Sequence, residues 1–316
     1  MKRYAYGVDL GGTTIKIGLF YASGEQVSRW EIPTRSKNHG KQLLPDIARA
    51  IQSNMQVYGL QPQMIEGIGL GVPGAVEDAS YVAPCVNLDG WGNLNAAKEL
   101  SKLCQLPTIV LNDANAAALG EMSHGGGKGY NNIVFVTLGT GVGGGIIIDG
   151  KLVAGTHGAG GEIGHIKVSE SNDRTCGCGS SGCLEQYASA TGLVYQAQKL
   201  LSSDDYTTIL QDNPNLTSKF IFDCAKQGDA VACELVHNMT TMLGKALSTV
   251  SCVCDPEIFV IGGGVSRAGD IIIDGTRKAF RQYAFPAARD TRFALATLGN
   301  DAGMYGAMHM AVYGKK

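Results

Sequence analysis

The sequence predicts an α/β fold built from two related units. Short apolar segments typical of buried strands alternate along the chain with longer segments whose apolar residues recur at helical spacing. The segment VDLGGTTIKIGLF, near the start, and the segment VTLGTGVGGGIII, from residue 136 on, share one plan of strand, glycine turn and strand. A length of 316 residues is also long for one compact core, so two domains or one large α/β unit are expected from length alone.

The first unit opens with a hairpin. Residues 4–27 carry alternating apolar positions on both sides of the turn DLGGTT, which predicts two strands, a second turn at residues 22–24 and a third strand. Residues 41–57 show apolar positions at helical spacing. A short strand that runs into a Gly/Pro loop, a helix and a strand follow at residues 65–76, 95–105 and 107–113, and another helix begins directly after them.

The second unit repeats the hairpin over residues 132–155. Apolar spacing then predicts helices at residues 184–201 and 220–251, and PEIFVIGGGVS predicts a strand that ends in three glycines. A helix of small residues closes the chain. We therefore expect a small N-terminal α/β domain, a larger C-terminal α/β domain with the cysteine-rich loop, and a last helix that completes the first domain, at residues 1–120, 121–300 and 301–316.

Charge, hydropathy and cysteine content argue against several classes of protein. The formal net charge is −2, with acidic and basic residues nearly balanced, whereas nucleic-acid-binding proteins usually carry a basic surplus. The longest apolar stretches contain glycines and are too short to span a bilayer, and we see no apolar region of a signal peptide. An odd number of cysteines, nine, does not suggest a disulfide framework, so we expect a reduced, cytoplasmic protein.

Two glycine turns are candidates for binding phosphate. Their backbone N–H groups can face an anion because glycine carries no side chain, and Asp9, just before the first turn, can hold Mg²⁺. Neither turn matches the dinucleotide-binding pattern or the P-loop pattern, and two purely structural hairpins are the alternative. The residues are Gly11, Gly12, Thr13 and Thr14 in the first turn, and Thr140, Gly141, Gly143 and Gly144 in the second.

Polar residues mark the end of one buried strand. Asn112 and Asp113 follow PTIVL, and open α/β sheets bind ligands beyond the carboxyl ends of their strands. Asp113 could accept a proton from a substrate hydroxyl group there. The alternative is a helix cap, because Asn and Asp are favoured at that position.

A cysteine-rich loop follows the segment GAGGEIGH. Glu162 and His165 can both hydrogen-bond hydroxyl groups, and His165 can also bind a metal. Beyond them, Cys176, Cys178 and Cys183 form the pattern C-x-C-x₄-C. Three thiolates and one imidazole make a closed, structural zinc site. A redox pair would more often be C-x-x-C, and an iron–sulfur cluster usually has a fourth thiolate, so zinc is our interpretation.

Together these motifs resemble the ROK family (repressors, open reading frames and sugar kinases), within the superfamily of sugar kinases, Hsp70 and actin. The resemblance covers nearly the whole chain, and the cysteine-rich run is its most specific part. The implied fold is the two-domain, actin-like ATPase (ribonuclease H-like) fold with a cleft between duplicated domains. The motifs that carry it are VDLGGTTIKIGL, GIGLGVPGAV, LNDANAAALGE, TLGTGVGGGIIIDGKLVAG, GAGGEIGH, CGCGSSGCLEQYAS and IFVIGGGVS.

The resemblance also implies a role for each matching residue. Asp113 would take the proton from the 6-hydroxyl of a sugar, and His165 would face both zinc and sugar. Asp9 and both glycine turns would hold phosphates and Mg²⁺, and Gly262, Gly263 and Gly264 would lie near the adenosine. The sugar-binding residues would be Asn87, Asn112, Asp113, Glu162, His165 and Glu185, and the zinc ligands would be His165, Cys176, Cys178 and Cys183.

The implied activity is ATP-dependent phosphorylation of glucose to glucose 6-phosphate, with ATP, Mg²⁺ and structural Zn²⁺ as cofactors. Another hexose or N-acetylhexosamine is the alternative substrate: N-acetylmannosamine, N-acetylglucosamine, fructose or allose. A sugar-responsive transcriptional repressor is a remote alternative, because the first glycine turn starts near residue 9 and we expect no helix-turn-helix unit before it. The resemblance implies a homodimer or larger homo-oligomer, with no nucleic-acid or membrane partner.

Overall fold

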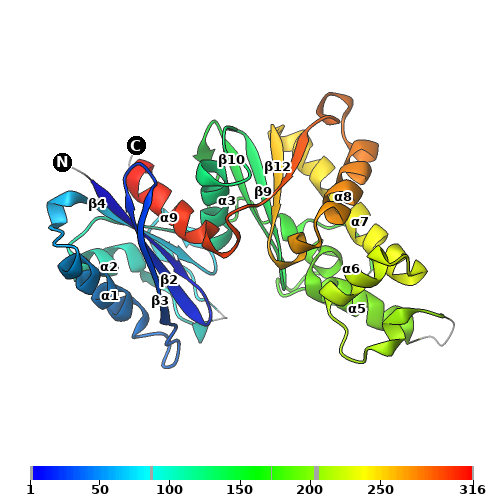
Figure 1. The fold of residues 1–316 in the computed structure, drawn as a ribbon, viewed down its shortest axis with the longest axis horizontal. Coiled ribbons are helices and arrows are strands. Elements are labelled where there is room, and N and C mark those ends of the chain that lie inside the picture. Colours follow the sequence, from blue (N-terminus) through cyan, green and yellow to red (C-terminus); the bar gives the residue numbers. More distant parts are fainter. Residues whose placement is uncertain (1–2, 86–87, 172, 203–205, 315–316) are drawn as a thin grey trace.

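The computed structural model describes residues 3–85, 88–171, 173–202 and 206–314. It is an elongated α/β molecule with two five-stranded sheets (Figure 1). In the first sheet β1, β2 and β3 pair antiparallel, whereas β1, β4 and β8 pair parallel. The order is β3-β2-β1-β4-β8, with bounds Gln26–Pro33, Thr14–Tyr21, Tyr4–Leu10, Ile65–Val72 and Thr108–Asn112.

The second sheet has the same plan as the first. Its strands β9, β10 and β11 pair antiparallel and its strands β9, β12 and β13 pair parallel, so the predicted duplication of an α/β unit is confirmed. Strand β13 was not predicted, because four residues, one exposed and three partly buried, are too few to show an alternating pattern. The order is β11-β10-β9-β12-β13, with bounds Lys151–Leu152, Val142–Ile148, Ile133–Leu138, Ile258–Gly262 and Arg292–Leu295.

Two helices form one core with the first sheet. Helix α1 (Leu43–Val57) buries Leu44, Ile47, Ala48 and Ile51 at the helical spacing that predicted it, and α2 (Ala96–Cys104) packs beside it. A small three-stranded sheet adjoins this unit. Its strands are Val76–Glu77 (β5), Tyr81–Val82 (β6) and Leu94–Asn95 (β7).

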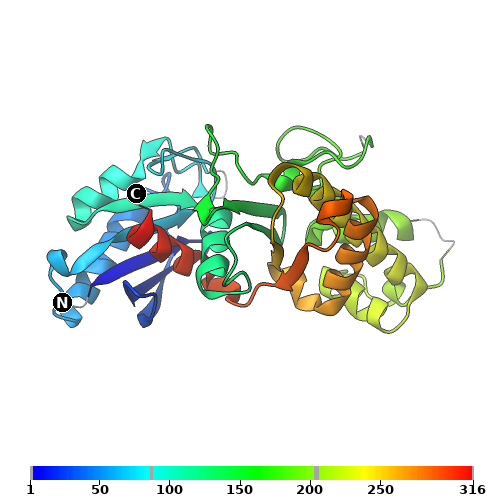
Figure 2. The same ribbon diagram turned by 90° about the horizontal axis from the view of Figure 1, so that it is seen from above.

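The helices of the second half gather at the far end of the molecule (Figure 2). The structure divides both helical stretches predicted there. The first divides at Ser189, whose hydroxyl accepts a hydrogen bond from the Gly192 N–H at 2.9 Å and so starts a new helix. The second divides at Gly228, whose φ of +88° is not helical. The helices are Glu185–Ala188 (α4), Ala190–Leu201 (α5), Ser218–Lys226 (α6), Ala230–Cys254 (α7) and Asp270–Tyr283 (α8).

Helices α3 (Asp113–His124) and α9 (Ala302–Tyr313) lie between the two sheets (Figure 1). Helix α9 packs against β1, β4 and α3, and α3 packs against β9 and β10 of the second sheet. The approach is close: a Cβ on Gly69 of β4 would lie 1.7 Å from the backbone oxygen of Ala307. The domain boundary predicted at residue 120 falls within α3 and stays a prediction.

The chain passes from one half of the molecule to the other twice: in the segment between α3 and β9, here called the first crossing, and in the segment between β13 and α9, the second crossing. One buried carboxyl group forms hydrogen bonds with both segments. Glu121, near the end of α3, is 0% exposed. It accepts hydrogen bonds from the N–H of Gly126 (2.7 Å) in the first crossing and from those of Thr297 (3.0 Å) and Leu298 (2.9 Å) in the second. These bonds compensate for the lost hydration of the carboxyl group. Within the described ranges, the helices include none of the length and apolar character that crossing a membrane requires.

Candidate active site and zinc centre

A polar cavity of about 630 Å³ lies between the two halves of the molecule. Its walls come from the ends of β1 and β8, the first turn of α3, strand β10, the segments around Glu162 and Glu185, and the second crossing before α9. The cavity brings together predicted residues for sugar and for phosphate. These are Asp9, Asn112, Asp113, Gly141, Gly143, Gly144, Glu162, His165 and Glu185.

The sheet topology explains why Asp9 and Asp113 meet in this cavity. Strands β1 and β8 both run parallel to β4, so their carboxyl ends lie at one edge of the sheet. Asp9 is the next-to-last residue of β1, and Asp113 follows β8 as the first residue of α3. Both carboxyl groups therefore face the space between the two halves.

Asn112 caps helix α3. Its side-chain oxygen accepts hydrogen bonds from the N–H groups of Ala114 (2.9 Å) and Asn115 (3.1 Å), and its amide donates to the backbone oxygen of Gly74 (3.0 Å). The two interpretations of this segment, helix cap and proton acceptor, therefore apply to different residues. Asp113 accepts one bond from the Ala114 N–H at 2.8 Å and keeps a carboxyl group in the cavity.

The Asp113 carboxyl group is suited to proton transfer near neutral pH. Solvent reaches it through the cavity mouth, but protein surrounds it on most other sides. Burial, helped by the negative charges of Asp9 and Glu162, raises the pKa of Asp113 to about 6 against the lowering effect of the Ala114 hydrogen bond. A group with such a pKa can accept a proton and release it again in each cycle.

Glu162, His165 and Glu185 form another wall of the cavity. His165 ends the short 3₁₀ helix Ile163–His165, and its Nε2 lies 3.8 Å from Oε2 of Glu162. Glu185 begins α4, and its Oε2 accepts a hydrogen bond from the Val142 N–H at 3.0 Å. A Cβ on Gly141 would lie 2.1 Å from that oxygen, so glycine at this position leaves room for the Glu185 carboxylate.

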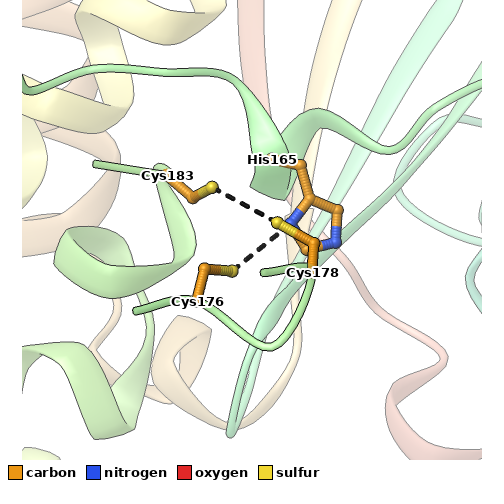
Figure 3. A group of neighbouring side chains, drawn as sticks. All are labelled: His165, Cys176, Cys178 and Cys183. Carbon is orange, nitrogen blue, oxygen red and sulfur yellow. Dashed lines mark hydrogen bonds between the residues drawn. The ribbon is translucent and has the colours of Figure 1, made fainter. Parts of the chain in front are cut away.

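The candidate zinc centre consists of His165, Cys176, Cys178 and Cys183 (Figure 3). Their four ligand atoms lie within 4.8 Å of one another; Cys176 Sγ is 3.6 Å from His165 Nδ1, and Cys178 Sγ is 3.7 Å from Cys183 Sγ. Sulfur ligands of a tetrahedral zinc, at about 2.3 Å from the metal, are about 3.8 Å apart. The four residues therefore fit a zinc ion, with Nδ1 turned to the sulfurs (Figure 3) and Nε2 on the side of Glu162.

Both glycine turns form, but Thr14 already begins β2, and Gly143 and Gly144 lie in β10 rather than in a turn. Some N–H groups of the turns are also used in hydrogen bonds within them. The N–H of Gly11 donates to Thr14 O at 3.1 Å and that of Gly139 to Gly141 O at 3.0 Å. A Cβ on Gly12 or Gly139 would meet no described atom within 4 Å, so both turns face open space. Asn87 lies outside the described residues, and the lining of the cavity does not include Gly11, Gly12, Thr13, Thr14, Thr140, Gly262, Gly263 or Gly264.

The residues that line the cavity but were not predicted from the sequence include Lys16, Asn300 and Gly303. Lys16 is directly opposite Asp9 in the pairing of β1 with β2, so the register of the predicted hairpin could have found it. Asn300 and Gly303 come from the second crossing and the start of α9, and no local pattern connects them with Asp9. A Cβ on Gly303 would lie 2.9 Å from the Asp9 carboxyl carbon.

Two sheets of the same topology, joined by α3 and α9 around a polar cavity, are the architecture of the actin-like ATPase fold. The chain belongs to the ROK family, whose model matches residues 5–313, and it is a sugar kinase of that family. The resemblance that its motifs indicated is thus confirmed.

Similar proteins include kinases for different sugars. A glucokinase from Halalkalibacterium halodurans is 41% identical over 309 residues, which cover 96% of this chain and 93% of the relative. An N-acetylmannosamine kinase from Shigella boydii is 33% identical over 307 residues, 96% of this chain and 97% of the relative. The structure of a ROK family glucokinase from Streptomyces griseus, in complex with glucose and AMPPNP, has a TM-score of 0.76 and 34% identity over 97% of this chain and 98% of its own.

Proposed function

We propose that this chain transfers the terminal phosphate of ATP to the 6-hydroxyl of glucose, giving glucose 6-phosphate and ADP. The observation that supports this proposal most strongly is that Asp113, with a pKa of about 6, shares one polar cavity with Glu162, His165 and Glu185. Such a set can orient a sugar through its hydroxyl groups and take a proton from one of them. The 41% identity to a glucokinase supports glucose as the sugar.

In the proposed reaction, the residues of the sugar site act mainly by position. Asn112, Glu162, His165 and Glu185 hold hydroxyl groups so that the 6-hydroxyl points at Asp113, and Asn87 is a further candidate for this task. The 6-oxygen forms a bond to the terminal phosphorus, the bond to the ADP oxygen breaks, and Asp113 receives the hydroxyl proton. The transition state of phosphoryl transfer is loose, so positioning and charge neutralisation provide most of the catalysis.

The nucleotide is proposed to bind between the two glycine turns. The carboxyl oxygens of Asp9 are suitable ligands for Mg²⁺, and the open space in front of Gly12 and Gly139 suits phosphate groups. Mg²⁺, when bound, would neutralise part of the negative charge of the phosphate groups. The proposed phosphate-binding residues are Gly11, Gly12, Thr13, Thr14, Thr140, Gly141, Gly143 and Gly144, and Gly262, Gly263 and Gly264 are proposed to lie near the adenosine.

Zinc is proposed to have a structural task. Held by His165 and the three cysteines, it supplies a rigid link between two parts of the sugar site. His165 would use Nδ1 for the metal, which leaves its other ring nitrogen, Nε2, free to bond a sugar hydroxyl. Glu185 follows the ligand Cys183 by two residues, so the cluster also orients this carboxylate.

The proposed function is tested by ADP release from ATP with a panel of sugars: glucose, N-acetylmannosamine, N-acetylglucosamine, fructose and allose. We expect glucose to give the highest kcat/KM, and ATP without sugar to be hydrolysed slowly. Turnover of an N-acetylated sugar, with none of glucose, would contradict the assignment of glucose. The control is the variant Asp149→Asn, which changes an exposed residue of the β10–β11 turn. Its kcat/KM for each sugar should match that of the wild type.

N-acetylmannosamine is the second candidate substrate, because a kinase for that sugar is 33% identical over nearly the whole chain. The panel above separates the two candidates directly. A cytoplasmic location, expected from the cysteine count, and a homodimer or larger homo-oligomer, implied by the family resemblance, remain predictions.

A further inference from the structure

A second cavity, of about 460 Å³, lies in the second half of the molecule and shares no lining residue with the polar cavity described above. Its walls come from the segment that precedes Cys176, from α4 and α5, and from α7. Two cationic side chains, Arg174 and Lys199, line it together with a single carboxylate, Asp173. Among the described lining residues, cations therefore outnumber carboxylates, which is the opposite of the balance in the active-site cavity.

Arg174 is the cation of this second cavity that has no carboxylate partner among the described residues. Its Nη1 is buried and has no hydrogen-bond partner, and its Cζ lies 4.8 Å from the centre of the Tyr195 ring. The ring attracts the positive charge through its face, but it leaves the N–H groups without a strong acceptor. A buried donor without an acceptor destabilises the protein, and an anion that accepts from the guanidinium group removes this penalty.

The Asp173 carboxylate is used elsewhere. It pairs with Nζ of Lys199 and accepts a hydrogen bond from the Ser171 hydroxyl at 2.6 Å. The Asp173 and Lys199 side chains are 36% and 59% exposed, so water weakens this pair and Lys199 is free to turn toward a ligand. Asn238 of α7 adds a neutral amide donor to the same walls. The described side chains thus offer positive charge and hydrogen-bond donors to an anion.

Two hydrogen bonds connect the second cavity with the zinc centre and the sugar site. The side-chain amide of Gln186 donates to the backbone oxygen of Arg174 at 2.6 Å, and its side-chain oxygen accepts from the Cys183 N–H at 3.1 Å. Gln186 is only 6% exposed, and it directly follows Glu185, whose side chain lines the active-site cavity. A change in the position of Arg174 therefore reaches Glu185 through one buried side chain.

We propose that the second cavity binds a phosphate group through the guanidinium group of Arg174, and that the bound anion strengthens glucose binding. Parallel N–H groups of a guanidinium match two oxygens of a phosphate. With its charge balanced, Arg174 keeps the segment before Cys176 in one position, and the hydrogen bonds of Gln186 then restrict the start of α4, where Glu185 lies. The phosphate group comes from inorganic phosphate or from a phosphorylated small molecule, since both present the same oxygens. The anion site stands without the proposed function, whereas its effect on glucose rests on that function.

A purely structural Arg174 makes a different prediction. If the guanidinium group only packs on Tyr195, its loss should lower the stability of the protein equally with and without phosphate. If Arg174 binds phosphate, the anion should stabilise the wild type, and this stabilisation should disappear with the guanidinium group.

The test is calorimetric titration of the whole, zinc-loaded chain with inorganic phosphate, glycerol 3-phosphate and glycerol at constant ionic strength. Mg·AMPPNP at saturation fills the phosphate positions proposed for the glycine turns. The variants are Arg174→Met, Arg174→Lys and the control Arg277→Met, which removes an exposed arginine of α8. For Arg174→Met we expect the Kd of phosphate to rise at least about tenfold, because charge-assisted hydrogen bonds are lost. Arg174→Lys should recover part of the affinity, since it keeps the charge but not the planar fork. Glycerol should not bind.

Glucose is then titrated with and without saturating phosphate. We expect phosphate to lower the Kd of glucose at least about threefold in the wild type and in Arg277→Met, and to leave it unchanged in Arg174→Met. Equal glucose affinity with and without phosphate in the wild type would overturn the coupling between the two sites.

Phosphate binding that is unchanged in Arg174→Met, or a wild type that binds no phosphate beside AMPPNP, would overturn the anion site. A preference for inorganic phosphate or for glycerol 3-phosphate identifies the source of the group and supports the site in either case. If Arg174→Met unfolds, Arg174→Lys and Arg174→Gln decide, since the first keeps the charge and the second keeps only hydrogen bonding. A wild type that binds phosphate through Arg174, but neither glucose nor Mg·AMPPNP, would support the anion site and contradict the proposed function.

Discussion

Asp113 is the residue on which the proposed chemistry depends most. It begins α3 at the carboxyl end of a parallel strand, and burial raises its pKa to about 6. Because the pKa is raised, the carboxylate form that accepts a proton is lost as the pH falls through about 6, whereas an unperturbed aspartate stays ionised down to about pH 4. We expect kcat to fall about tenfold per pH unit below that value, measured as a pH–rate profile.

Removing the Asp113 carboxylate should remove most of the activity. We expect Asp113→Asn to lower kcat by a factor of at least about 10², with glucose affinity changed little, because the amide keeps the shape of the side chain but cannot take the proton. The exposed Asp149→Asn variant should keep the wild-type profile. Near-normal turnover by Asp113→Asn, or a flat profile between pH 5 and 7, would show that Asp113 is not the base.

Residues of the site differ in how well their positions could be predicted from the sequence. The position of Asp113 at the cavity was predictable because open α/β sheets bind ligands beyond the carboxyl ends of their strands. Its alternative task, capping the helix, belongs to Asn112 in the structure. Lys16 looked like an ordinary polar residue of an alternating strand, and its contacts with Asp9 and Asn300 became visible only with the pairing register and the second crossing in place. Gly141 was predicted for phosphate, and the structure adds that its missing side chain makes room for Glu185.

At the scale of elements, the cysteine-rich loop is the segment expected to affect sugar binding most. Its four predicted ligands converge, and it joins His165 to Glu185 across a short stretch of chain. The side-chain oxygen of the buried Gln186 accepts a hydrogen bond from the Cys183 N–H at 3.1 Å, which ties the start of α4 to the cluster.

Loss of zinc should therefore weaken sugar binding much more than nucleotide binding. For a chelated protein, or the variant Cys178→Ser, we expect the Kd of glucose to rise at least about tenfold, because ligands of this kind lose their orientation without the metal. The Kd of Mg·ADP should change little. Calorimetry checks both values, metal analysis confirms the loss of zinc, and Cys233→Ser, an exposed cysteine on α7, is the control. Unchanged glucose affinity in a folded, metal-free variant would contradict this.

Elements with clear periodicity were predictable, and their ends were less so. The β1–β2 hairpin and α1 follow directly from apolar spacing. The divisions at Ser189 and Gly228 were missed, because a continuous apolar face runs past both positions while a local cap or a left-handed backbone ends the helix.

At the scale of the whole molecule, the repeated glycine hairpin predicted two related units, and both sheets have the same topology. How the units are joined could not be predicted, because the contacts are distant in the chain. Glu121 bonds N–H groups that follow it by 176 and 177 residues, and Gly69 faces Ala307 of α9. Such pairs leave no local pattern, yet they place Asp9, Asp113 and Asn300 around one cavity.

The most direct test of the central claim, phosphoryl transfer from ATP to a sugar in this cavity, is to follow ATP and glucose by ³¹P NMR in the presence of the protein and Mg²⁺. We predict that one phosphate ester at the 6-hydroxyl appears for each ADP formed, and that Asp113→Asn forms neither at a comparable rate. A folded, zinc-loaded protein that leaves ATP and glucose unchanged, or that forms ADP and free phosphate without a sugar phosphate, would contradict the claim.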